Sequence, residues 1–162
     1  SRLGYVHHTN PSHQCLLVPD CLRSLSFPEQ EHRYNDIYVA TETCEWLFQD
    51  PGYETWTKSA QGLFWIKGNP GTGKSVLMKH AARRMIEQNP DELVVSYFIH
   101  GQGSELQRTP SGVFRTILNS LLAHFPARLA KFTAIFEDRE KRFGGYLAGR
   151  WSWNYKELQE SC

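Results

Sequence analysis

The feature that most constrains the fold of this chain is a glycine-rich run, Gly68-Asn69-Pro70-Gly71-Thr72-Gly73-Lys74-Ser75. It matches the phosphate-binding-loop pattern G-x-x-x-x-G-K-[ST] at every fixed position. The apolar stretch 63–67 before it predicts a short buried strand, and the periodic stretch from 75 to about 88 predicts a helix. A strand, a glycine-rich loop and a helix in this order direct backbone N–H groups at a phosphate. We therefore expect the chain to bind a nucleoside triphosphate or diphosphate.

The residue types in the run suit polyphosphate chemistry. Gly71 and Gly73 tolerate positive φ and place no side chain against a phosphate. Lys74 brings a cation to the β- and γ-phosphates, and the Ser75 hydroxyl is a ligand for Mg²⁺. The predicted nucleotide contacts are Gly68, Asn69, Pro70, Gly71, Thr72, Gly73, Lys74, Ser75 and Val76. Lys67 precedes the run, and a lysine there more often ends a strand in solvent than binds a second phosphate.

Composition is that of an ordinary globular domain. The chain has 162 residues, of which 40% are hydrophobic and 22% charged, with a net charge of +1. This balance gives no electrostatic reason to expect nucleic acid or an anionic membrane as a partner. No apolar run approaches the ~20 residues of a membrane span, and the four cysteines lack the spacing of a metal module. We expect a cytoplasmic protein with reduced thiols.

Periodicity and punctuation predict the remaining elements. Prolines and polar residues make 1–28 an irregular N-terminal segment, and 29–162 is expected to form one nucleotide-binding domain. A second strand over 93–100 would complete a right-handed βαβ unit with the strand at 63–67. Helices are expected over 34–48, from Pro110 to about 125, from 127 to 142 and from 152 to 160.

Several stretches together resemble one known family. They are the leading segment 21–28, the Thr43-Cys44-Glu45-Trp46 part of the first helix, the loop signature 62–79, the stretch 96–99 with Gly101, and Leu118–Leu122 with Pro126. In these stretches the chain resembles the NACHT-type P-loop NTPase domain of fungal NLR-like (STAND) proteins, the nephrocystin-3-like N-terminal domain family. The loop alone occurs in many families, whereas the combination is far more specific.

The resemblance implies an α/β fold, a three-layer P-loop NTPase-type architecture with a parallel sheet. It also implies a switch that binds ATP or GTP with Mg²⁺, self-associates and works with other domains of a longer protein. In the resembled family, residues just before the sheet pack on the base, which points to the region Arg33–Ile37. Arg33 and Ile37 are equally well read as ordinary helix and core residues.

One part of the family's pattern is not found. The family holds Mg²⁺ with a Walker B strand, a run of apolar residues followed by acids. The nearest candidate, Ala134–Asp138, lies inside a helical pattern and is rejected, and the family's own strand lies beyond a segment like Trp151–Leu158. We therefore expect a domain truncated before Walker B, and we assign no catalytic residue. Two alternatives stay open: another P-loop ATPase such as an AAA+ protein, and an interaction scaffold that does not hydrolyse nucleotide.

Overall fold

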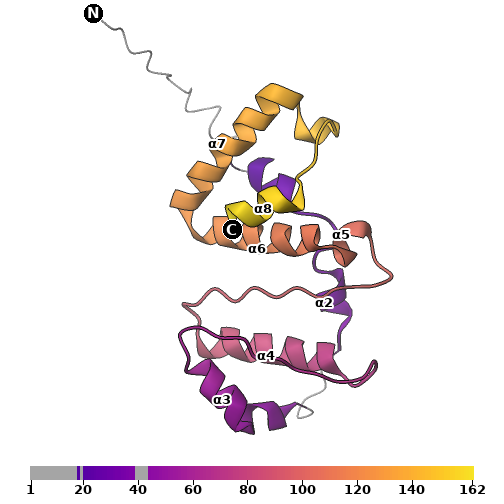
Figure 1. Ribbon diagram of the computed structural model, residues 1–162, viewed down its shortest axis with the longest axis vertical. Helices are drawn as coiled ribbons and strands as arrows, with labels where there is room; N and C mark the ends of the chain where they lie inside the picture. The colour runs from indigo at the N-terminus through magenta and orange to yellow at the C-terminus, as the bar shows by residue number, and fades with distance from the viewer. Residues whose placement is uncertain (1–17, 19, 39–43) are drawn as a thin grey trace, which may run out of the picture. The chain divides into compact units, whose positions relative to one another are not determined.

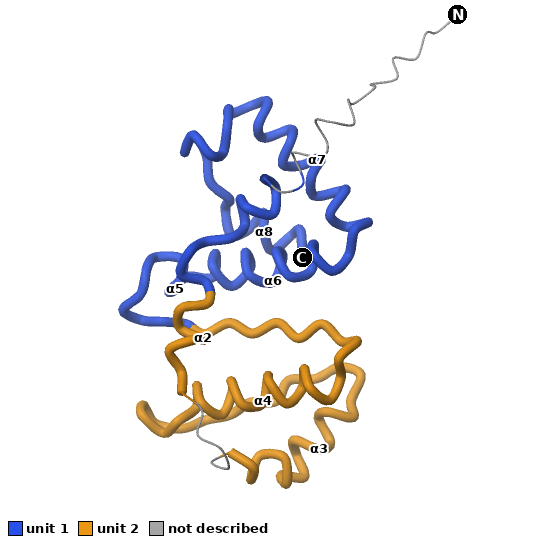
Figure 2. Tube along the Cα trace, turned by 180° about the vertical axis from the view of Figure 1, so that it is seen from behind, with its two compact units in different colours: residues 1–30, 99–162 blue, residues 31–98 orange. Residues whose placement is uncertain are grey.

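The computed structural model describes residues 18, 20–38 and 44–162 (Figure 1). Its elements are α2 His32–Asp36, η1 Glu45–Gln49, α3 Pro51–Thr57, α4 Lys74–Gln88, α5 Glu105–Arg108, α6 Pro110–His124, α7 Pro126–Phe143, η2 Tyr146–Ala148 and α8 Tyr155–Ser161. The chain divides into two compact units (Figure 2). Unit 1 comprises residues 1–30 and 99–162, and unit 2 comprises residues 31–98.

Unit 2 is built around α4 and the short helices that precede it. Leu77 and Ala81, one turn apart on α4, lie on the same face and are both buried. They form a core with Cys44, Leu47 and Tyr53, against which the partly buried side chains of Phe64 and Ile66 pack. Asp50 begins α3, since its carboxylate accepts hydrogen bonds from the N–H groups of Gly52 at 2.8 Å and Tyr53 at 3.0 Å.

Unit 1 is a helical cluster centred on α6, α7 and α8. Its buried core consists of Cys21, Leu25, Leu118, Leu122, Phe132, Phe136, Trp153 and Leu158. Two polar side chains in this core are paired, because Trp153 Nε1 donates to Ser24 Oγ at 2.9 Å and Ser24 Oγ donates to the Cys21 carbonyl at 2.7 Å. Cys21 and Ser24 lie within the helical stretch 20–25, so the chain before α2 contributes directly to this core.

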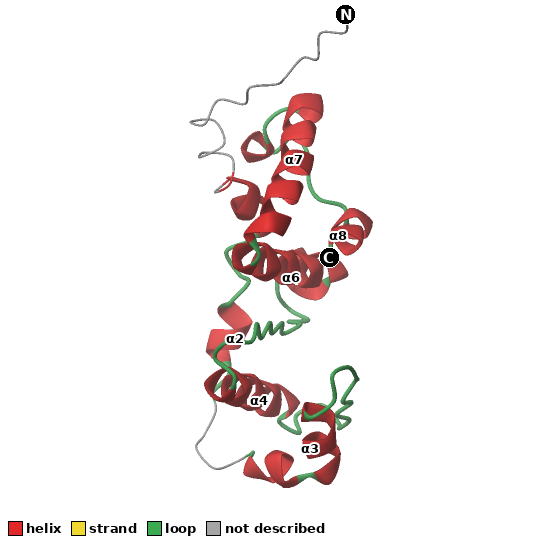
Figure 3. Ribbon diagram, turned by 90° about the vertical axis from the view of Figure 1, so that its left-hand side faces the viewer, coloured by secondary structure: helices red, strands yellow, loops and turns green. Residues whose placement is uncertain are grey.

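The expected α/β fold with a parallel sheet is wrong for the described residues, which are mainly helical and contain no β-strand (Figure 3). The two stretches expected as strands, 63–67 and 93–100, are non-helical and lack ladder pairing. Figure 1 shows the second one running back along α4 as an extended chain. They have different neighbours: Phe64 packs with the Leu77 core, whereas Phe98 meets the ring of Tyr34. β-forming residues favour an extended backbone, but a strand also needs a partner at about 4.8 Å.

The single helix expected over 34–48 is also wrong. The chain forms α2, leaves helical geometry at Ile37 with φ −77° and ψ 109°, and resumes as the 3₁₀ helix η1. Residues 39–43 lie outside the described part of the chain. Three apolar residues at helical spacing in this stretch, Ile37, Cys44 and Leu47, are nevertheless buried, each at most 6% exposed. The spacing of these three residues therefore agrees with their burial, although they do not lie on one helix.

The four other helices that the sequence predicted lie close to their expected positions, whereas α3, α5 and η2 were not predicted. α4, α6 and α7 lie where they were expected, and α8 begins slightly later, at Tyr155. Thr109 is the N-cap residue of α6 and Pro110 its first residue. Most of the segment 1–28, expected to be irregular, lies outside the described residues, and its described end is helical over 20–25.

Candidate functional site

The glycine-rich loop, Gly68–Ser75, runs into the first turn of α4 within unit 2. Gly71 and Gly73 both have φ of +81°, the left-handed region that glycine enters without steric cost. Gly73 is the N-cap of α4, which begins at Lys74 and runs for 15 residues. Both glycines for which the sequence suggested positive φ therefore adopt it.

Lys74 folds back over the loop. Its Nζ donates to the carbonyl of Gly68 at 2.8 Å and to that of Asn69 at 2.7 Å. The hydroxyl of Thr72 donates to the same Asn69 carbonyl at 2.8 Å. These contacts close the loop around the ammonium group, which carries three donors and can exchange a carbonyl for a stronger anionic acceptor.

The N-terminus of α4 presents unused backbone donors beside that ammonium. The first intrahelical bond runs from the Leu77 N–H to the Gly73 carbonyl at 2.9 Å. The N–H groups of Lys74, Ser75 and Val76 have no hydrogen-bond partner among the described residues. Such donors, at the positive end of a helix of this length, favour an anion.

These groups line a pocket of about 390 Å³ within unit 2. Its lining residues are Arg33, Asp36, Ile37, Tyr38, Gly71, Gly73, Lys74, Ser75 and Val76. The volume falls in the range of small-molecule sites. Five of the nine predicted contacts thus line the pocket; the other four, Gly68, Asn69, Pro70 and Thr72, form the rest of the loop.

The other lining residues of the pocket belong to α2 and to the two residues that follow it. The sequence pointed to Arg33–Ile37 only through the family resemblance, and the structure places Arg33, Asp36 and Ile37 in the pocket. Tyr38 also lines the pocket and was not anticipated, because the resemblance pointed only to Arg33–Ile37. We name the segment Arg33–Tyr38 the pocket wall.

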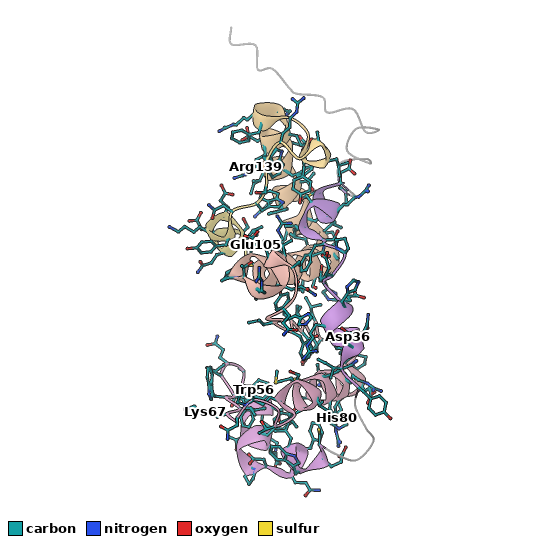
Figure 4. All side chains as sticks on the ribbon, turned by 90° about the vertical axis from the view of Figure 1, so that its right-hand side faces the viewer. Asp36, Trp56, Lys67, His80, Glu105 and Arg139 are labelled. Atoms are coloured by element: carbon teal, nitrogen blue, oxygen red, sulfur yellow. The ribbon has the colours of Figure 1, made fainter. Side chains whose placement is uncertain are left out.

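Lys67 does not take part in the pocket. Its side chain is exposed, and it is not among the lining residues. Figure 4 shows the labelled Lys67 and Asp36 well apart within unit 2. This agrees with the interpretation of Lys67 as a solvent-exposed residue rather than a second phosphate ligand.

No metal centre is preformed in the part of the chain that the structure describes, since no three His, Cys, Asp or Glu side chains come together there. A cation at the pocket would be held by the Ser75 hydroxyl and by oxygens of the ligand, which suits Mg²⁺.

Ala134–Asp138 lies within α7, which confirms its rejection as a Walker B strand. None of the described helices combines the length and apolar character needed to cross a bilayer.

Comparison with known proteins places the chain in a family. Residues 42–161 match the nephrocystin 3 N-terminal family, over well more than half of the sequence. The matched part includes the glycine-rich loop and begins after the pocket wall. Searches of curated proteins and of solved structures gave no match. This chain therefore belongs to the nephrocystin 3 N-terminal family.

Proposed function

We propose that the chain binds ATP or GTP, as a triphosphate or diphosphate, at the glycine-rich loop and the N-terminus of α4. The observation that supports this best is the convergence of unlike phosphate-binding groups on one pocket. Three N–H groups without a partner among the described residues, the Lys74 ammonium and two glycines with positive φ meet there. Each feature alone is weak evidence, but together they match the requirements of a polyphosphate.

In this proposal the phosphates take the loop side of the pocket. Lys74 gives up a loop carbonyl for a phosphate oxygen, a change that charge assistance favours. Ser75 holds Mg²⁺, whose positive charge would neutralise phosphate oxygens. The base and ribose lie toward the pocket wall, where Arg33 and Asp36 supply hydrogen-bonding groups of opposite charge.

We further propose that binding serves as a switch in a cytoplasmic NLR-like signalling protein of NACHT type. Self-association and contacts with other domains of a longer protein would then depend on the nucleotide. This part of the proposal rests on the sequence resemblance and on the loop. It invokes no parallel sheet and assigns no catalytic residue, so hydrolysis is left out of it.

Equilibrium titration with fluorescent analogues of MgATP and MgGTP tests the proposal. Lys74→Ala removes the ammonium at the loop, and we expect it to weaken binding by more than about tenfold, the effect of losing a charge-assisted hydrogen bond. Lys67→Ala is the matched control, because it removes a nearby lysine that lies outside the pocket. We expect its affinity to equal that of the unaltered chain.

Two results would contradict the proposal. Equal affinity for the unaltered chain and Lys74→Ala would mean that nucleotide, if bound, lies elsewhere. No binding of either nucleotide to the unaltered chain would favour the alternative of an interaction scaffold. Circular dichroism of each variant separates loss of binding from loss of fold.

A further inference from the structure

Lys79 connects the helix that carries the loop to the pocket wall. It lies on α4, and its Nζ donates to the carbonyl of Tyr34 at 2.5 Å and to that of Ile37 at 2.8 Å. The same ammonium lies 4.3 Å from the centre of the Tyr34 ring. One partly buried cation thus holds two backbone carbonyls and an aromatic face more than 40 residues away in sequence.

Among the residues that the structure describes, few other contacts hold the pocket wall in place. α2 has only five residues, and none of these five is buried. A helix of this length is not stable by itself in water. Its N-cap Glu31 makes no capping hydrogen bond through its side chain. Besides Lys79, its described anchors are the ring contact between Tyr34 and Phe98, with centroids 5.8 Å apart, and the buried side chain of Ile37.

The ammonium of Lys79 contacts the pocket wall, and its hydrogen bonds to Tyr34 and Ile37 do not involve the glycine-rich loop. It is not among the residues that line the pocket, and its ammonium is engaged by the Tyr34 and Ile37 carbonyls. Those two carbonyls flank Asp36, which does line the pocket. Fixing the backbone on either side of Asp36 fixes where the wall presents its side chains.

We propose that Lys79 is a positioning residue that sets the affinity of the pocket for the nucleoside part of a nucleotide. This inference rests on the proposed function and assigns separate roles in it to Lys74 and Lys79. Lys74 and the α4 N-terminus hold the phosphates, while Lys79 orders the wall that the base and ribose meet. Ordering the wall before binding lowers the entropy lost when the ligand arrives.

The test compares two ligands that share the phosphate chain but differ in the nucleoside. Affinities of Mg-tripolyphosphate and of MgATP or MgGTP, whichever binds more tightly, are measured by calorimetry. Lys79→Met keeps the length and apolar stem of the side chain but removes its donors and charge. We expect nucleotide affinity to fall by about tenfold or more, as for loss of charge-assisted hydrogen bonds, and tripolyphosphate affinity to stay within about twofold.

Two further variants control the comparison. Lys79→Arg retains cationic donors, and we expect it to recover much of the nucleotide affinity. Arg83→Met removes another cation from α4, but one whose side chain is 54% exposed and lies away from the pocket. We expect it to leave both affinities unchanged. If Lys79→Met does not fold, Lys79→Gln provides the same comparison with the charge removed and one amide donor group kept.

The outcomes separate this inference from the proposed function. If the unaltered chain binds nucleotide but loss of the Lys79 charge weakens both ligands equally, or neither, the inference is wrong and the proposed function stands. If the unaltered chain binds neither ligand, both fail. A selective loss of nucleotide affinity, with faster amide hydrogen exchange at 33–38, supports the positioning role.

Discussion

At the scale of single residues, Gly73 shows how one position shapes the start of α4. Its φ of +81° is unfavourable for any residue with a Cβ, and it is the N-cap of the helix. A Cβ added at Gly73 would meet no atom within 4 Å. The requirement for glycine there is therefore conformational and not a matter of space.

We predict that Gly73→Ala destabilises the chain by about 1 kcal/mol, the cost of holding an L-residue in left-handed geometry. Urea denaturation measures the change in the free energy of unfolding, and amide hydrogen exchange in α4 shows whether the loss lies in this helix. Gly101→Ala is the control, because a Cβ at Gly101 also meets nothing within 4 Å and its φ lies outside the positive region. Equal effects of the two substitutions would contradict the argument.

At the scale of elements, Glu45 joins η1 to α4. One carboxylate oxygen lies 3.1 Å from His80 Nε2, and the other accepts from Arg84 Nη1 at 2.7 Å. The Arg84 guanidinium also lies 4.2 Å from the centre of the Phe48 ring. Hydrogen bonds from His80 and Arg84 hold the pKa of Glu45 below its ordinary value of 4.5.

We predict a pH-dependent contribution of Glu45 to stability. A lowered folded pKa means that the unfolded chain takes up the proton first, so the stabilisation is present above about pH 4.5 and is lost as pH falls through the lower folded value. The thermal midpoints of the unaltered chain and Glu45→Gln should therefore differ at pH 7 and converge in acid.

Glu87→Gln is the control for this prediction. Its carboxylate lies 4.0 Å from Arg83 on the same helix, with both side chains more than half exposed, and such pairs contribute little. A difference in thermal midpoint that persists unchanged into acid would mean that Glu45 acts through packing and not through its charge.

The elements also show which sequence signals are reliable. Pro110 is the first residue of α6, and Gly144 follows the end of α7, because proline and glycine constrain the backbone locally. The same reasoning found the loop and the start of α4. It failed for the strands at 63–67 and 93–100, because pairing depends on a partner that local sequence does not specify.

At the scale of the whole molecule, each unit depends on its own buried core. In unit 1, α8 packs on α6, and Leu158 is fully buried beside Leu118, Leu122 and Trp153. α8 is only seven residues long, so its stability comes from this packing and from the Asn154 capping box.

We predict that Leu158→Ala destabilises unit 1 by about 2–5 kcal/mol, the range for emptying a buried leucine site. Hydrogen exchange of α6 and α8 amides, together with urea denaturation, measures the loss. Leu147→Ala provides the matched control, since Leu147 lies in the same unit and is 62% exposed. A comparable loss for Leu147→Ala would show that burial is not what makes Leu158 important.

The sequence by itself determined the loop, with its two left-handed glycines and Lys74, and the extents of α4, α6 and α7. These depend on backbone preferences and contacts within a few residues, which a linear pattern records. Only the tertiary structure decided that the stretches 63–67 and 93–100 form no β-ladder, that α2 ends at Asp36, and that Lys79 reaches Tyr34. Those outcomes depend on contacts between residues tens of positions apart, and the free energy of such contacts is set by which surfaces meet in the folded chain.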